Sequence, residues 1–297
     1  MIPLVHHPDY DAASVGDDHR FPMRKYSKVA AILRGRGAEF VQPTYAPAEW
    51  LSLAHEPGYV SAVLSQTVDR PTTRKIGFEI TDAIARRTRA SVAGTALAAR
   101  LALEHGAAAN LAGGSHHASY RGGAGFCVFN DVAVAAKLLL AEGAVRRILV
   151  VDCDVHHGDG TAVIFSSDPA VYTFSLHCEA NWPRAKPPSD LDVGLAKGAG
   201  DDVYLEALDR ALATAFEAAN PDLVFYNAGV DPHADDRLGL LALSDAGLRR
   251  RDARVARQCK SNNVPICGVL GGGYSKDIDA LAARHCLMVE SFERDHV

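Results

Sequence analysis

Three carboxylates and two imidazoles crowd one short stretch of the chain. Asp152, Asp154 and Asp159 share residues 152–160 with His156 and His157. The stretch directly follows the apolar run 148–151, which is typical of a buried parallel strand. Because ligands of open α/β sheets gather at the carboxyl ends of such strands, the sequence predicts a functional site here.

The period of two along an extended chain indicates which of these groups act together. Asp152, Asp154 and His156 point to one side, so Asp154 and His156 are placed to bind the same cation. Carboxylate oxygen and imidazole nitrogen suit zinc, or another first-row divalent ion such as ferrous iron. The alternative is a polar turn in which Asp159 only caps the next helix. That alternative leaves five ionisable groups together without a cation to compensate them.

Three other predicted strands end in residues of similar chemistry. Residues 108–112 lead into His116 and His117, residues 223–228 into Asp231, and residues 266–270 into three glycines and Tyr274. Parallel strands bring these ends to one edge of the sheet, so we expect all of them to line one crevice. A catalytic zinc ion needs a third protein ligand, and Asp231 is the candidate. The alternative for Asp231, which precedes a proline, is a simple turn.

The tandem histidines His116 and His117 have the chemistry of a general acid and a general base. A hydrolase needs a base for the attacking water and an acid for the leaving amine, and imidazole titrates in the right range. Each ring needs a carboxylate on its other nitrogen, and Asp152 and Asp159 remain for this task. The alternative is a pair of surface histidines.

Tyr274 and the segment around Phe126 complete the predicted crevice. The Tyr274 phenol is placed to donate a hydrogen bond to a carbonyl oxygen as negative charge develops on it. The alternative for Tyr274 is a buried ring with one hydrogen-bonded hydroxyl. Gly125 and Phe126 are predicted to wall a substrate channel, with the core as the alternative place for Phe126.

Short apolar runs alternate with amphipathic segments along the whole chain, which is the pattern of an α/β fold. Strands are predicted at residues 2–5, 39–42, 108–112, 147–152, 171–176, 223–228 and 266–270. Helical periodicity covers residues 26–35, 80–105, 131–142, 204–219, 245–260 and 278–285. No linker or repeat interrupts this alternation. We therefore predict a single three-layer α/β/α domain over residues 1–297, with a mostly parallel central sheet.

Composition limits the classes of function. The 297 residues are 48% hydrophobic and 23% charged, and the net charge of −5 with a pI near 6.2 argues against direct nucleic-acid binding. The arginine groups 86–89 and 249–251 are predicted to be solvated helix faces. Six cysteines show no CxxC pair, and no segment is typical of an export signal or a membrane span, so we expect a cytoplasmic protein.

Taken together, these motifs resemble the histone deacetylase family, including its bacterial acetoin-utilisation and acetylpolyamine amidohydrolase relatives, within the arginase-deacetylase fold. The resemblance runs from the His19 segment to the glycine-rich end at Tyr274, in the family's order. It implies metal ligation by Asp154, His156 and Asp231. It also implies catalytic roles for the following residues: His116, His117, Asp152, Asp159 and Tyr274.

The resemblance has further implications around this centre. It implies a structural potassium ion near Asp152, Ser175 and the backbone carbonyls of Asp154, His156 and Leu176, and a second one at residues 165–171. It implies a basic residue beside an internal acetate-release pocket, for which the chain offers Arg24 or Lys25. After Ser175 the family carries a second aromatic channel wall, and Trp182 is the residue available for it here.

These observations predict a zinc-dependent amidohydrolase that removes acetyl or other acyl groups from lysine side chains of proteins or peptides, or from related amines. No long insertion of the polyamine-specific kind is visible, which favours lysine substrates or another small acylated amine. The alternatives are an acetylpolyamine or other small-molecule deacetylase and a non-catalytic acyl-lysine-binding scaffold. Binuclear manganese chemistry is disfavoured, because Asp235 and Asp236 lie too far past Asp231 to supply bridging carboxylates.

Overall fold

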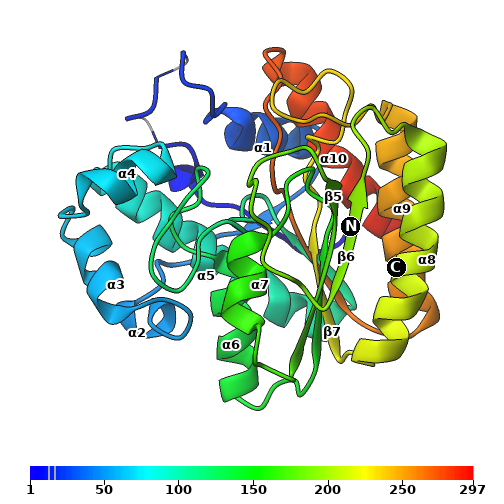
Figure 1. Cartoon of the computed structure of the whole chain (residues 1–297), viewed down its shortest axis with the longest axis horizontal. Coiled ribbons are helices and arrows are strands. Elements are labelled where there is room, and N and C mark those ends of the chain that lie inside the picture. The colour runs from blue at the N-terminus through cyan, green and yellow to red at the C-terminus, as the bar shows by residue number, and fades with distance from the viewer. Residues whose placement is uncertain (13, 17, 297) are drawn as a thin grey trace.

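A parallel β-sheet forms the centre of the computed structural model, which describes residues 1–12, 14–16 and 18–296 (Figure 1). The sheet has eight strands in the order β2-β1-β3-β8-β7-β4-β5-β6, and every described strand pair is parallel. The strands are β1 Leu4–Val5, β2 Phe40–Val41, β3 Ala107–Asn110, β4 Ile148–Asp152, β5 Val171–Cys178, β6 Leu191–Leu195, β7 Leu223–Asn227 and β8 Ile266–Val269. Strands β3, β4, β7 and β8 are buried along their whole length, as their apolar runs predicted.

Helices cover both faces of this sheet (Figure 1). Helices α5 Asp82–His105, α6 Asp131–Ala141 and α7 Asp159–Phe165 pack in sequence on one face. Helices α1 Lys25–Gly35, α8 Asp201–Ala219, α9 Asp245–Ser261 and α10 Ile278–Asp295 pack side by side on the other. The short helices α2 Ala48–Leu51, α3 Pro57–Leu64 and α4 Arg70–Ile76 extend the first layer. The predicted single α/β domain is therefore confirmed.

Local sequence signals define the ends of the long helices. The side chains of Thr81, Asn130, Ser244 and Asp277 each accept a hydrogen bond from a backbone N–H in the first turn of α5, α6, α9 and α10. Gly106 ends α5 with a φ of 86°, a conformation that glycine adopts without strain.

Several observed elements differ from the predicted ones. Strand β6 was not predicted, because this edge strand alternates exposed and half-buried residues and carries a glycine. The short helices α2, α3 and α4, and helix α7 after the acidic stretch, were also outside the predicted list. Helix α10 continues past the predicted end at residue 285 to Asp295.

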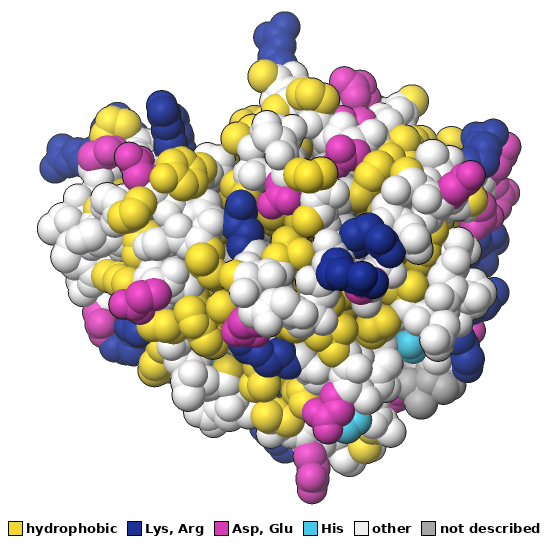
Figure 2. Space-filling view, turned by 90° about the horizontal axis from the view of Figure 1, so that it is seen from below, with side chains coloured by type: hydrophobic (Ala, Val, Ile, Leu, Met, Phe, Trp, Pro, Cys, Tyr) yellow, Lys and Arg dark blue, Asp and Glu magenta, His cyan; other side chains and the backbone are white. Residues whose placement is uncertain are grey.

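The expected basic helix faces are wrong for two residues. Arg87 and Arg251 are 6% and 0% exposed, so neither lies on a solvated face. Basic side chains do reach the surface elsewhere, and Figure 2 shows one face of the molecule on which basic and acidic side chains are interspersed.

Among the described residues, none of the helices has the length and apolarity that crossing a membrane requires.

The strand order explains why the site residues meet. Strands β3, β8, β7 and β4 are consecutive neighbours at the centre of the sheet. Each is a strand whose carboxyl end leads into predicted site residues: His116 and His117 after β3, Tyr274 after β8, Asp231 after β7 and Asp154 after β4. The four ends therefore form one continuous edge, on which these side chains converge.

Candidate active site

Asp154, His156 and Asp231 form a buried group that could hold a metal ion. Each offers one ligand atom, and the three atoms lie within 4.8 Å of one another. His156 Nδ1 is 3.0 Å from Asp154 Oδ1 and 3.2 Å from Asp231 Oδ2. Carboxylate oxygens and an imidazole nitrogen are zinc ligands, and three protein ligands leave the fourth position open, as in catalytic zinc sites.

Backbone N–H groups hold the two carboxylates in place. The Val155 N–H donates to Asp231 Oδ1 at 2.9 Å, and the Gly272 N–H donates to Asp154 Oδ2 at 2.7 Å. A side chain at Gly272 would collide with both carboxylates, so the glycine after β8 is a steric requirement of the site. The second carboxylate oxygen of each aspartate remains turned toward His156.

The titration behaviour of this group fits a divalent cation. Burial and the neighbouring Asp154 charge raise the pKa of Asp231 to about 7. Burial opposes protonation of His156, but Asp154 and Asp231 outweigh it and raise the His156 pKa to about 10. Without a cation, His156 and Asp231 therefore tend to keep their protons near neutral pH, which offsets the negative charge of the two buried carboxylates. A divalent cation would supply positive charge at the same place.

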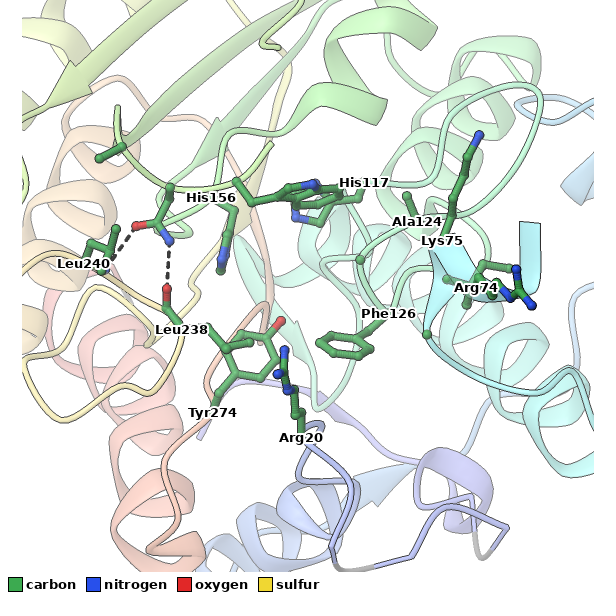
Figure 3. A pocket seen from close by; sticks show the side chains of 16 residues that line it. Arg20, Arg74, Lys75, His117, Ala124, Phe126, His156, Leu238, Leu240 and Tyr274 are labelled. Carbon is green, nitrogen blue, oxygen red and sulfur yellow. Dashed lines mark hydrogen bonds between the residues drawn. The ribbon is translucent and has the colours of Figure 1, made fainter. Parts of the chain in front are cut away.

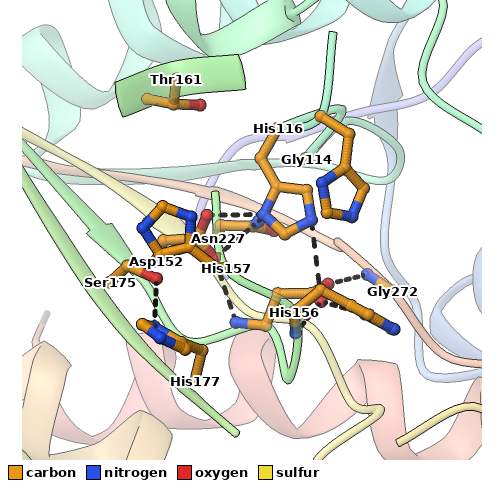
Figure 4. A network of polar contacts seen from close by, with 12 residues as sticks. Gly114, His116, Asp152, His156, His157, Thr161, Ser175, His177, Asn227 and Gly272 are labelled. Atoms are coloured by element: carbon orange, nitrogen blue, oxygen red, sulfur yellow. Dashed lines mark hydrogen bonds and ion pairs between the residues drawn. The ribbon is translucent and has the colours of Figure 1, made fainter. Parts of the chain in front are cut away.

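The tandem histidines lie beside this group, each with its own carboxylate. Figure 4 shows the first pair, His116 and Asp152. His116 Nδ1 is 2.7 Å from Asp152 Oδ2, and His117 Nδ1 is 2.5 Å from Asp159 Oδ1. The two imidazole centroids are 4.1 Å apart. The structure thus places the expected carboxylates within hydrogen-bonding distance of the two histidines.

The two histidines have opposite protonation preferences. Burial opposes a charge on His116, but Asp152 and Asp154 outweigh it and raise the His116 pKa to about 9. Burial and the charge of His116 lower the pKa of His117 to about 3, in spite of the hydrogen bond to Asp159. A protonated His116 next to a neutral His117 gives one donor and one acceptor side by side.

A pocket of about 810 Å³ opens above these groups (Figure 3). His117, His156 and Tyr274 line its floor, and Gly125, Phe126 and Trp182 are among its wall residues. The Trp182 ring meets His117 edge-on at 4.6 Å between centroids. The predicted channel residues therefore all line the pocket, and Phe126 is a wall residue packed against the edge of the core.

The wall at residues 125–126 has an unusual backbone. Phe126 has a φ of 67°, a left-handed conformation that side chains rarely adopt, and Gly125 has a φ of 53°. A Cβ on Gly125 would come within 2.6 Å of the His117 ring and 2.8 Å of Trp182. Glycine at position 125 therefore leaves room for the His117 and Trp182 rings next to this wall.

Tyr274 presents its hydroxyl to the same pocket (Figure 3). Burial and the charges of Asp154 and Asp231 hold its pKa well above the ordinary value, so the phenol stays protonated and can donate a hydrogen bond. The Tyr274 N–H donates to Asp236 Oδ2 at 2.7 Å. This contact was not predicted, because it depends on a loop that brings Asp236 back to Tyr274 from a distant place in the sequence.

Buried basic residues lie behind the floor. Lys25 is fully buried and donates from Nζ to the Gly271 carbonyl at 2.9 Å, whereas Arg24 is exposed. Of the two candidates for the inner basic residue, the structure places Lys25 under the site. Arg87 lines a small cavity of about 20 Å³ behind the tandem histidines, and it donates to the Tyr10 carbonyl and the Tyr26 hydroxyl.

Arg251 supports the strand ends that carry the metal-binding group. Its guanidinium donates to the carbonyls of Cys153, Ala228 and Gly229, at the ends of β4 and β7. It also pairs with Asp252 at 2.8 Å. The sequence contained no signal for this contact, because it joins positions that are distant along the chain.

A second group, His157, His177 and Asp192, could also hold a metal ion. Figure 4 shows its two histidines. His157 Nε2 is 3.0 Å from Asp192 Oδ1, and His177 Nδ1 is 3.0 Å from the Ser175 hydroxyl. None of the three is among the described residues that line the large pocket. This group was not predicted, because Asp192 lies on strand β6, which the sequence pattern does not reveal.

Comparison with known proteins agrees with this geometry. The histone deacetylase domain matches residues 19–289. The chain belongs to the histone deacetylase family. Its fold is also that of solved relatives: the HD domain of HDA15 superposes with a TM-score of 0.82 at 22% identity, covering 98% of this chain and 91% of that one. An acetylpolyamine aminohydrolase from Burkholderia pseudomallei superposes with a TM-score of 0.80 at 20% identity, covering 99% of both chains.

Several relatives align with most of this chain. An uncharacterized protein of Picosynechococcus is 46% identical over 291 residues, which is 97% of both chains. Histone deacetylase 2 of Arabidopsis thaliana is 32% identical over 93% of this chain and 75% of its own. A polyamine deacetylase of Mus musculus is 32% identical over 98% of this chain and 48% of its own. Both protein deacetylase and polyamine deacetylase names therefore occur among the relatives.

Proposed function

We propose that this family member is a zinc-dependent amidohydrolase that removes acetyl or other acyl groups from lysine side chains of proteins or peptides, or from related amines. One observation carries the proposal. The buried Asp154, His156 and Asp231 group reaches the floor of the pocket through His156, and His117 and Tyr274 line the same floor. This arrangement supplies the metal ligands, the base and the oxyanion donor that amide hydrolysis needs.

We assign the metal to Asp154, His156 and Asp231, with zinc as the first choice and ferrous iron as the alternative. When bound, the cation would polarise the acyl carbonyl and the attacking water. The oxygen and nitrogen donor set supports either ion.

The protein groups then perform the proton transfers. His117 accepts a proton from the water as the water oxygen adds to the acyl carbon. His116, kept protonated by Asp152, donates a proton to the amine nitrogen as the carbon–nitrogen bond breaks. Asp159 orients His117. Tyr274 donates a hydrogen bond to the carbonyl oxygen while that oxygen carries negative charge, and the products are a carboxylic acid and a free amine.

A structural potassium ion is part of the proposal. Asp152 and Ser175 are directly paired across β4 and β5, which supports a shared cation between them. The carbonyls of Asp154, His156 and Leu176 are the other proposed ligands. A second potassium site is proposed at residues 165–171.

The catalytic domain is proposed to span residues 1–297, of which 13, 17 and 297 lie outside the described part. Its cytoplasmic location and the acetate-release role of Lys25 remain predictions.

Two other functions are tested together with this one. An acetylpolyamine deacetylase is supported by the polyamine deacetylase among the relatives. A non-catalytic acyl-lysine-binding scaffold is opposed by the presence of both His117 and Tyr274 in the pocket.

The deciding experiment is an assay of a panel of acyl-lysine peptides and acetylated polyamines, with zinc, iron and potassium measured in the same preparation. We expect hydrolysis of acetyl-lysine peptides by protein that contains about one divalent ion per chain, and loss of hydrolysis on chelation. Binding of acyl-lysine peptides without any hydrolysis would support the scaffold instead. Faster hydrolysis of acetylpolyamines than of every peptide would support the polyamine function.

A further inference from the structure

Three basic side chains line the mouth of the large pocket. Arg20 comes from the loop before α1, and Arg74 and Lys75 come from the last turn of α4 (Figure 3). We call these three residues the basic mouth. All three are exposed, and none of the described residues that line this pocket is an aspartate or a glutamate.

The charges of the basic mouth are not neutralised locally. None of its three side chains has a carboxylate of a described residue within ion-pair distance, whereas exposed basic residues such as Arg36 and Arg86 do. Lys75 has a weak electrostatic effect on Asp69, whose pKa is lowered chiefly by hydrogen bonds from Thr72 and to a smaller extent by Lys75. Asp18 lines a neighbouring hollow that it shares with Arg20, and Glu79 lines another that it shares with Arg74, but neither carboxylate lines the large pocket.

The basic mouth is fixed to the channel wall. The backbone carbonyls of Lys75 and Ile76 accept hydrogen bonds from Gly125 at 2.9 Å and from Phe126 at 2.7 Å. The Gly77 carbonyl lies 3.1 Å from His19 Nε2, next to Arg20 in the chain. The segments that carry all three charges are therefore attached to one another and to the wall that the substrate must pass.

We propose that this pocket selects acylated amines that carry carboxylates beyond the scissile amide, such as an acyl-lysine with acidic neighbours, and disfavours polycationic amines. The inference rests on the proposed hydrolase function and deepens it. An anionic group at the mouth meets three positive charges and no negative one, which favours its approach and its binding. A polyamine or a basic peptide meets repulsion at the same place. Because these contacts exist equally before and during the reaction, they should change KM far more than kcat.

The test compares substrates that differ only in charge. Acetyl-lysine peptides of equal length with glutamate, glutamine or lysine on both sides are assayed on the metal-loaded enzyme, together with N-acetylputrescine. Free acetyl-lysine and its amide distinguish an α-carboxylate from acidic side chains as the recognised group. We expect kcat/KM to fall from the glutamate to the lysine peptide by about tenfold, equivalent to about 1.4 kcal/mol, and the difference to shrink at high salt.

Single-charge variants locate the effect. Arg20→Gln, Arg74→Gln and Lys75→Gln should each raise KM for the glutamate peptide by about two- to fourfold, as expected for a partly screened exposed charge, and should leave the glutamine peptide unchanged. Arg146→Gln removes one exposed positive charge just before β4, at the opposite end of that strand from the site. It is the matched control, for which no change is expected.

The outcomes separate this inference from the proposed function. Equal rates for the three peptides, or a preference for the lysine peptide or N-acetylputrescine, overturn the inference while the hydrolase function stands. If no substrate is hydrolysed, the hydrolase function fails. Binding of the same peptides, measured by fluorescence anisotropy, then decides the inference: tighter binding of the glutamate peptide supports it, and equal or weaker binding overturns it.

Discussion

The floor and the mouth of the pocket are built in different ways. At the floor and directly beneath it, the side chains are at most 7% exposed: His117, His156 and Tyr274 at the floor, and Asp154, Asp231 and His116 beneath it. Backbone N–H groups at neighbouring strand ends donate hydrogen bonds that fix the metal-binding carboxylates. At the mouth, Arg20, Arg74 and Lys75 are exposed, and only the backbone of their segments is tied down. Buried groups with fixed partners can distinguish a transition state from a substrate, whereas exposed charges attract both equally.

This contrast predicts large effects of substitutions at the floor and small effects at the mouth. The largest is expected for Asp231→Ala. The change removes one of three ligands and leaves the Val155 N–H without its acceptor, so the protein should lose most of its divalent metal and its activity should fall to background.

Elemental analysis of purified protein measures the metal directly, whatever the activity. Asp235→Ala is the control, since Asp235 is a nearby carboxylate with an exposed side chain outside the metal-binding group. Full metal occupancy in Asp231→Ala would exclude Asp231 as a ligand and would weaken the distinction between floor and mouth.

The next largest effect is expected for His117→Ala. His117 is neutral and not one of the metal-binding group, so the variant should keep its metal while kcat falls by about 10²- to 10⁴-fold, the usual contribution of a general base. Steady-state kinetics with metal analysis checks both parts, and added imidazole should restore part of the rate. The control is His105→Ala, at the exposed end of α5. Turnover at the wild-type rate would remove His117 from the mechanism.

Tyr274→Phe should have a somewhat smaller effect. The ring and its packing remain, so metal content, thermal stability and KM should stay near the wild-type values. The lost hydroxyl matters only as the carbonyl oxygen becomes charged, and kcat should fall by about 10²- to 10³-fold.

Tyr120→Phe removes a hydroxyl from an exposed tyrosine and serves as the control. An unchanged kcat, or a loss of metal or of folding in Tyr274→Phe, would show that Tyr274 is structural. In that case the scaffold function would gain support.

The difference between the two regions also explains what the sequence could predict. The floor follows from a local pattern repeated at strand ends: an apolar run, then glycine, aspartate or histidine. Once the strands are known to be parallel, convergence of β3, β4, β7 and β8 requires only that they be neighbours. The fold class and the membership of the Asp154, His156 and Asp231 group therefore follow from short segments of sequence.

The supporting residues could not be predicted in this way. Arg251 lies in a helix rich in arginine, and nothing local distinguishes it from Arg249 and Arg250, which are exposed. Its burial depends on carbonyls at the ends of β4 and β7. The choice of Lys25 over Arg24 likewise depends on which side of α1 faces Gly271.

The mouth was also beyond prediction, because it depends on loops. Arg20 and Lys75 are far apart in sequence, and they share a pocket because loop contacts, among them hydrogen bonds of His19 and Gly125 with the end of α4, hold their segments together. Such contacts leave no periodic pattern in the sequence. The strand ends determine the centre of the site, whereas contacts between loops determine which residues surround it.

Outside the basic mouth, the smallest effect is expected for Trp182→Ala, at the border between the floor and the mouth. Trp182 is 49% exposed and contacts His117 edge-on, so its loss should weaken substrate contact without releasing metal or lowering thermal stability. We expect KM to rise by about fivefold, equivalent to about 1 kcal/mol of lost aromatic contact, with kcat nearly unchanged. Steady-state kinetics on a neutral acetyl-lysine peptide measures this, and Trp182→Phe should recover most of the affinity. If kcat instead falls about 10²-fold, as for loss of a general base, Trp182 holds His117 in its reactive orientation and belongs functionally to the floor.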